Sequence, residues 1–149
     1  MPKKKSQVQN IVETVPLRID LGCGPNPREG FIGVDSIQFP GVQIVTDLKK
    51  RWPWDDATVE EAHASHVVEH FDRIERVHFW NELCRVLKIG SKATIICPHW
   101  SSGRAYGDPT HAWTPVSGFA FFYLLRDWRM QNAPHTDKQH WDKGFTCDF

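Results

Sequence analysis

Residues 17–24, LRIDLGCG, decide the fold, because a short apolar strand runs there directly into two closely spaced glycines. Glycine has no Cβ, so a backbone passing through Gly22 and Gly24 can turn sharply and approach a ligand closely. A Gly-x-Gly pattern alone occurs in many turns. The dinucleotide fingerprint has a third glycine that opens a helix, whose N-terminus holds the pyrophosphate. Because Pro25-Asn26-Pro27 follow here instead, the sequence disfavours a diphosphate cofactor and favours one without phosphate.

The rest of the chain alternates short apolar runs with one clear amphipathic segment. Apolar residues recur at three- and four-residue spacings over residues 74–87, which predicts a helix ended by Ile89-Gly90. We also expect strands at residues 17–21, 31–35, 42–47, 61–65 and 93–97, a buried helix at 115–126 and an edge strand at 144–149. These elements predict an α/β fold with an open, mainly parallel, Rossmann-like sheet, which binds ligands at the carboxyl ends of its strands. This single domain spans residues 15–149, after a Lys-rich tail at 1–14 that we expect to be flexible.

Two of the expected strands end in a carboxylate. Asp35 ends the second strand, where Rossmann-like proteins place the acid that accepts hydrogen bonds from ribose hydroxyls. Asp47 ends the third strand, where it can accept an adenine amino group while Leu48 packs on the ring. Each acid also has a local interpretation, Asp35 as a turn former and Asp47 as a helix N-cap. Together with the glycine loop, the two carboxylates favour a nucleoside site.

Five stretches within residues 17–98 resemble, in their order, the cofactor-binding core of the class I S-adenosylmethionine-dependent methyltransferases. They are LRIDLGCGPNP, FIGVD, TDLKKRWPW, ASHVVEHF and ELCRVLKIGSKATIICP. The resemblance implies S-adenosylmethionine (SAM) as cofactor and a role for each matching residue. The loop of Asp20, Gly22, Cys23 and Gly24 lines the methionine part, Asp35 holds the ribose, Asp47 and Leu48 hold the adenine, and Ser65 and His66 lie beside the sulfonium. Methyl transfer from a sulfonium depends on positioning, so we expect no metal and no covalent residue.

The sequence also departs from that family. The links at residues 25–30 and 36–41 are too short for the helices that usually follow the first and second strands. One face of the sheet then lacks cover, and a bare apolar face is unstable in water. We expect the N-terminal segment, the 115–126 helix or a second subunit to cover it. The shortening also favours an alternative function, a SAM-binding module without catalysis or a subunit of a complex.

The polar loop at residues 99–114 follows the fifth strand, so we expect it to overhang the cofactor edge. His111 is a candidate catalytic base, since imidazole titrates near neutral pH, and Asp108 is placed to orient it. The DPTH segment at 108–111 resembles one found after this strand in some small methyltransferases. The aromatic residues Trp100, Tyr106 and Trp113 are candidates for the wall of an acceptor pocket. The alternative is a loop held together by its own aromatics and a Pro turn.

A rival motif lies at residues 66–70, HVVEH, which matches the H-x-x-E-H of inverted zinc peptidases. On a helix, His66 and His70 would share one face and bind zinc, with Glu69 as the base. Such a site needs a third ligand, usually a downstream Glu, and the sequence has no Glu after Glu82. Asp108, His99 or His111 would have to substitute, so we favour a strand-to-helix turn here.

The composition limits the kinds of binding partner that we expect for this chain. With 18 basic and 18 acidic residues the formal net charge is zero, which gives no global attraction to nucleic acid or anionic membranes. The Lys-rich tail keeps nucleic acid open as a partner, but a small-molecule acceptor fits better. The four cysteines form no CxxC pair, and no stretch reaches the roughly 18 apolar residues of a membrane span. We therefore expect a reduced, cytoplasmic methyltransferase, with a second copy as one candidate cover for the sheet.

Overall fold

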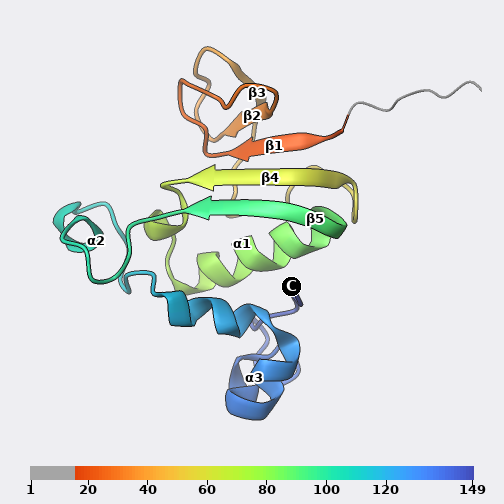
Figure 1. Cartoon of the computed structure of the whole chain (residues 1–149), viewed down its shortest axis with the longest axis vertical. Helices are drawn as coiled ribbons and strands as arrows, with labels where there is room; N and C mark the ends of the chain where they lie inside the picture. Colours follow the sequence, from red (N-terminus) through yellow and green to blue (C-terminus); the bar gives the residue numbers. More distant parts are fainter. Residues whose placement is uncertain (1–15) are drawn as a thin grey trace, which may run out of the picture.

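A computed structural model describes residues 16–149 of the chain (Figure 1). The expectation of a flexible tail at 1–14 lies outside the described residues. Among residues 16–149, no helix has the length and apolar character needed to cross a membrane.

The centre of the fold is a five-stranded sheet in the order β3-β2-β1-β4-β5. Every neighbouring pair is parallel, which confirms the predicted open parallel α/β architecture. The strands are β1 (Arg18–Leu21), β2 (Ile32–Asp35), β3 (Val42–Val45), β4 (Val59–Ser65) and β5 (Leu87–Ile96). The strand order reverses beside β1, so the glycine loop that follows β1 lies at the switch point where such sheets bind ligands.

The main crossover helix is α1 (Arg73–Val86), which runs along β4 and β5 in Figure 1. A capping box starts it: the Asp72 carboxylate accepts from the N–H groups of Ile74 and Glu75, and the Glu75 carboxylate accepts from the Asp72 N–H. The helix predicted over residues 74–87 is confirmed, but Ile89-Gly90 does not end it. The helix ends at Val86, because the next residues are extended and pair with β4 from the Val59–Leu87 match onward.

The two faces of the sheet differ in polarity. Ile19, Leu21, Val34, Ala62 and Ala64 alternate onto one face, where they are fully buried in the core with α1. The intervening positions put polar side chains on the other face: Arg18, Asp20, Glu61, His63, Lys92 and Thr94. The expectation of an apolar second face was therefore wrong, because alternation makes that face polar. Its central residues Asp20 and His63 are buried, with Arg28 and Phe31 of the β1–β2 link against them. Such a face is compatible with water and needs no apolar cover.

The C-terminal third contains α2 (Arg104–Gly107), a 3₁₀ helix η2 (Gly118–Leu124), α3 (Arg126–Asn132) and a 3₁₀ turn η3 (Pro134–Thr136). In this third, α2 lies beyond the carboxyl ends of β4 and β5, and the later segment with α3 lies on the α1 side, away from β2 and β3 (Figure 1). The predicted buried helix at 115–126 is thus a 3₁₀ helix, and it is largely exposed, with Leu124 its one buried residue. It packs on α1 through Phe121 and Trp80 rather than on the open sheet face.

The predicted edge strand at 144–149 was also wrong. Phe145 forms a single isolated bridge with Asp137, and no strand forms there. The Asn81 side chain on α1 holds this segment instead. Its amide donates to the Gly144 carbonyl (3.1 Å), and its oxygen accepts from the N–H groups of Thr146 (2.8 Å) and Cys147 (3.1 Å).

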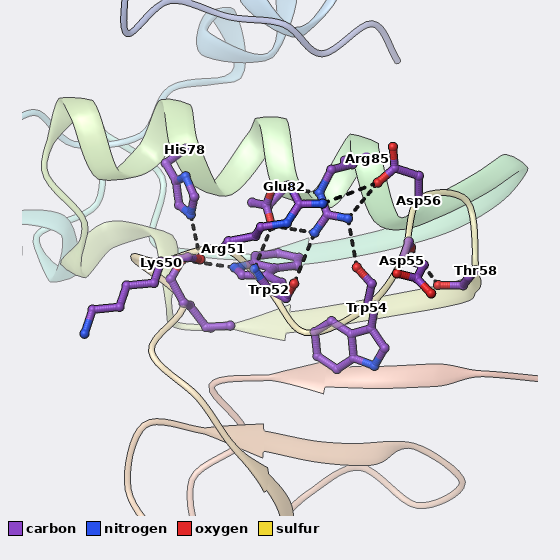
Figure 2. A network of polar contacts seen from close by, with 11 residues as sticks. Lys50, Arg51, Trp52, Trp54, Asp55, Asp56, Thr58, His78, Glu82 and Arg85 are labelled. Carbon is purple, nitrogen blue, oxygen red and sulfur yellow. Dashed lines mark hydrogen bonds and ion pairs between the residues drawn. The ribbon is translucent and has the colours of Figure 1, made fainter.

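A polar network ties the β3–β4 connection to α1 (Figure 2). The buried Glu82 carboxylate accepts from the Trp52 N–H at 2.7 Å and from the Arg85 guanidinium at 2.6 Å. Arg85 also donates to the carbonyls of Trp52 and Trp54 and to the Asp56 carboxylate. These bonds fix the connection that leads from the predicted adenine site back into β4.

Candidate functional site

The glycine loop after β1 turns through left-handed conformations. Gly22 has a φ of 65° and Gly24 a φ of 57°, which glycine adopts without strain. The N–H groups of Gly22 and Cys23 both donate to the Val34 carbonyl, at 2.8 and 3.1 Å. A Cβ at Gly22 would lie 2.5 Å from Cγ2 of Val67, so this glycine also permits a close approach.

Asp35, at the end of β2, links the second strand to this loop. Its Oδ2 accepts from the Gly24 N–H at 2.8 Å, and its Oδ1 accepts from the Ile37 N–H at 3.0 Å. Each carboxylate oxygen accepts two hydrogen bonds when ionised, so both retain capacity for a ligand. The structure thus places Asp35 directly beside the loop, with one bond that a purely local turn does not explain.

A cavity of about 270 Å³ lies next to the loop. Its lining includes four of the predicted residues, Asp20, Gly22, Cys23 and Ser65, together with Asn26, Arg28 and His63. Asp20 is almost fully buried. Its Oδ1 lies 2.7 Å from Nδ1 of His63, and its Oδ2 accepts from the Arg28 N–H at 2.7 Å. Both oxygens of Asp20 are therefore engaged in shaping the cavity.

The remaining residues predicted to bind the nucleoside follow the end of β3. The Thr46 N–H donates to the Asp35 carbonyl at 2.9 Å, which brings this strand end close to Asp35. The Asp47 carboxylate is half-buried, accepts from the Lys49 N–H at 3.0 Å and pairs with Lys50 at 3.7 Å. Leu48 is 6% exposed and belongs to the hydrophobic core, so little of its surface is left for a ring to pack on.

A second, larger cavity of about 740 Å³ lies beyond the end of β4. His66, Asp108 and His111 line it, with Pro98, Gly103, Arg104, Gly107 and Pro109. Because Ser65 lines the first cavity and His66 the second, both cavities open at the same strand end. The aromatic wall expected for this cavity is not formed there. Trp100, Tyr106 and Trp113 are each at least half exposed, and none of them lines the cavity.

The predicted catalytic pair is close but not hydrogen-bonded. Nε2 of His111 lies 3.7 Å from Oδ2 of Asp108. Oδ1 of Asp108 accepts from the Thr110 N–H (2.8 Å) and hydroxyl (2.7 Å), and these bonds hold the pKa of Asp108 below its usual range. Asp108 is thus an ionised turn residue that also faces His111.

No protein-family model and no curated protein matches the sequence. Among solved structures, the fold matches the crystal structure of a SAM-dependent methyltransferase from Archaeoglobus fulgidus, with 25% sequence identity and a TM-score of 0.64. The match covers 76% of this chain, which spans 60% of the length of that one. The chain has a shortened class I methyltransferase fold.

Sequence reasoning missed three residues that line the methyltransferase fold's first cavity, Asn26, Arg28 and His63. His63 carried a usable signal. In a strand it lies on the same face as Ser65, two residues later, while Ala62 and Ala64 lie on the other face. Its pairing with Asp20 depends on the parallel register of β1 and β4, which places the two residues side by side. No local pattern specifies that register.

The zinc-peptidase interpretation depends on a helix that this methyltransferase fold does not form. Residues Val68–His70 are the 3₁₀ turn η1, and His66 precedes it with a φ of 58°. His66 and His70 therefore do not share an α-helical face. Nδ1 of His66 instead lies 2.9 Å from Oε1 of Glu69.

Cys23 lies in the glycine loop between two acids of the methyltransferase core. Burial raises the pKa of its thiol, and the negative charges of Asp20 and Asp35 raise it further. The thiol is therefore neutral at physiological pH, which suits a lining residue and not a nucleophile.

Proposed function

We propose that this protein is a SAM-dependent methyltransferase that acts on a small-molecule acceptor. The observation that carries the proposal is the assembly, at the switch point of a methyltransferase-like sheet, of the loop, Asp20 and Ser65 around one cavity beside Asp35. These residues come from β1, β2 and β4, far apart in sequence. Their convergence supports a shared ligand better than separate local roles.

The cofactor would extend from the first cavity along the strand ends. Asp20, Gly22, Cys23 and Ser65 would line its methionine part, Asp35 would accept from the ribose hydroxyls, and Asp47 would face the adenine. The lack of a helix after Gly24 fits a cofactor without a diphosphate. Leu48 would contribute from beneath, as part of the core that supports the loop.

The second cavity would hold the acceptor. When bound, SAM supplies an electrophilic methyl group that is displaced in line by a nucleophile, so the chain's main tasks are alignment and exclusion of water. His66 stands at the junction of the two cavities, and His111 is only 11% exposed in its side chain. His111 would take a proton from the acceptor, and ionised Asp108 would favour the resulting imidazolium.

Calorimetric titration with SAM and S-adenosylhomocysteine tests the cofactor. Asp35→Ala should weaken binding by roughly 1–3 kcal/mol if its carboxylate holds the ribose. The matched control is Asp55→Ala, because Asp55 is exposed and lies in the β3–β4 connection (Figure 2). This connection leads into the start of β4, at the edge of the parallel sheet opposite to the loop after β1. No binding of either compound at millimolar concentration would refute the proposal. An unchanged affinity in Asp35→Ala would remove that residue from the site.

A second experiment separates an enzyme from a SAM-binding module. S-adenosylhomocysteine release is followed with a panel of simple phenol, thiol, amine and carboxylate acceptors. In an enzyme, His111→Ala lowers turnover while SAM affinity stays within a few-fold of wild type. The control is His140→Ala, at an exposed position remote in sequence. SAM binding without release for any acceptor class supports the module.

A further inference from the structure

Three side chains that can bind a metal ion meet beside the second cavity, and the proposed SAM site uses only one of them. Glu69 and His70 come from η1, and His111 comes from the loop after β5. A carboxylate oxygen of Glu69 and one ring nitrogen of each histidine lie within 4.8 Å of one another. The Ala112 N–H donates to the Glu69 carbonyl at 2.8 Å. This bond holds the loop against η1 and keeps the three side chains together.

Both histidines are oriented in the way that metal ligands usually are. Nδ1 of His70 lies 3.3 Å from the Thr110 carbonyl, and Nδ1 of His111 lies 3.4 Å from the Ala105 carbonyl. An imidazole that donates from Nδ1 to a backbone carbonyl leaves the lone pair of Nε2 free, and this arrangement accompanies most metal-bound histidines. The two rings are 4.9 Å apart and nearly perpendicular.

The Glu69 carboxylate supplies the independent observation. Glu69 is 4% exposed, and its Oε1 is paired with Nδ1 of His66. Within residues 16–149, its buried Oε2 has no hydrogen-bond partner. The nearby Arg76 guanidinium donates to backbone carbonyls and forms no ion pair with Glu69 in the described chain. Leaving a buried carboxylate oxygen without a partner is costly, and a bound cation would remove that cost.

We propose that Glu69, His70 and His111 bind one divalent transition-metal ion, for which Zn²⁺ is the best match to two imidazoles and one carboxylate. Tetrahedral Zn²⁺ places its ligand atoms about 3.4 Å apart. The present cluster, whose ligand atoms lie within 4.8 Å of one another, therefore has to contract by up to about 1.4 Å. His70 is exposed and can move by this amount. Asp108, whose Oδ2 is 3.7 Å from Nε2 of His111, is a candidate for the fourth position.

The metal site borders the acceptor cavity but does not depend on SAM. It does change the role of His111, because a ring nitrogen bound to a metal cannot also accept a proton from an acceptor. His66, which faces Oε1 of Glu69, becomes a positioning residue that orients the carboxylate.

The test uses tag-free protein, dialysed against EDTA and then titrated with Zn²⁺ by calorimetry and with Co²⁺ by visible absorption, without SAM. We expect one ion per chain, d–d bands of a low-coordinate Co²⁺ site, and a rise in the thermal midpoint with Zn²⁺. Because SAM is absent, the outcome is independent of the proposed methyltransferase activity. No stoichiometric binding of either ion would overturn the proposal.

Variants locate the ion. Glu69→Gln, His70→Ala and His111→Ala should each lower metal affinity by roughly 100-fold or more, and His66→Ala by about 10-fold, the range seen for outer residues. His140→Ala is the control and should bind as wild type does. Metal-free Glu69→Gln should melt no lower than the metal-free wild type, since the change removes a buried carboxylate of which one oxygen, Oε2, has no partner among residues 16–149. This readout shows that the variant folds. Equal affinity in the wild type and all three ligand variants would place the ion elsewhere and overturn the proposal.

Discussion

Alanine substitutions at Gly22 and Gly24 separate two reasons for which the loop needs glycine. Both residues have positive φ, so each alanine carries a strain of about 1–2 kcal/mol. The lower entropy of the unfolded chain offsets about 0.5–1 kcal/mol of this strain. A Cβ at Gly24 meets nothing within 4 Å, so we expect Gly24→Ala to lower the free energy of unfolding by about 1 kcal/mol.

Gly22→Ala adds a clash to the same strain. Its Cβ would lie 2.5 Å from Cγ2 of Val67, a buried β-branched residue whose χ1 rotates little. Overpacking of this kind costs about 1–3 kcal/mol, so the total reaches roughly 2–4 kcal/mol. Urea denaturation measures both variants, and the Gly22→Ala/Val67→Ala double variant should recover the clash as a coupling energy. A Gly22→Ala cost no larger than that of Gly24→Ala would refute the reasoning.

Three further predictions concern α1 and the segments it holds. Glu82→Ala leaves Arg85 and the Trp52 N–H without their buried partner and should lower the free energy of unfolding by about 3 kcal/mol in urea denaturation. Burial alone would raise the pKa of Glu82, but the hydrogen bonds from Arg85 and Trp52 outweigh burial and lower the pKa. The stability that ionised Glu82 contributes is therefore complete above about pH 5 and is lost as the pH falls through the pKa of the folded state. Glu82→Gln should reduce this loss of stability at acid pH. Asn81→Ala removes three bonds to residues 144–147 and should cost about 1–3 kcal/mol, with faster hydrogen exchange at the amides of that segment; unchanged exchange would show that other contacts hold it.

The positions of the strands along the sequence were predictable, because each strand depends on a local sequence pattern. Apolar runs between glycines and prolines located β1, β2 and β3, and the carboxyl-end rule placed Asp20 and Asp35 at one edge. The polar face was also readable in the alternation of Glu61, His63 and Ser65 with alanines, although the expectation of a two-sided cover obscured it. Burial of both faces is the rule for parallel sheets. In residues 16–149 the second face of this sheet is polar, although Asp20 and His63 on it are buried.

The unpredicted features depend on contacts between distant segments. Residues 118–124 are apolar all round, so periodicity cannot show which side is buried or whether the turn is α or 3₁₀. The pairing of Asp20 with His63 needs the β1–β4 register. Glu69 lies near His111 only because the loop after β5 folds back on η1, where the Ala112 N–H donates to the Glu69 carbonyl. The HVVEH pattern pointed to the segment that supplies Glu69 and His70, but it could not show that these two residues face His111, which lies 42 and 41 positions further along the chain.

The polar sheet face leads to a prediction about assembly. Thr94 lies on that face, beside His63 and between Lys92 and Ile96 on β5. If the face is open to water, Thr94→Arg adds one exposed charge, so the free energy of unfolding should change by less than about 0.5 kcal/mol, and light scattering after gel filtration should report one chain before and after the substitution. Gln131→Arg, at an exposed position on α3, is the control for the added charge. If a second copy covers the face, the wild type should instead have the mass of a dimer. The arginine of the variant would then be buried in the interface and break it, so the variant should have the mass of one chain. That result would mean that the polar side chains of the face contact a second copy and are not solvated.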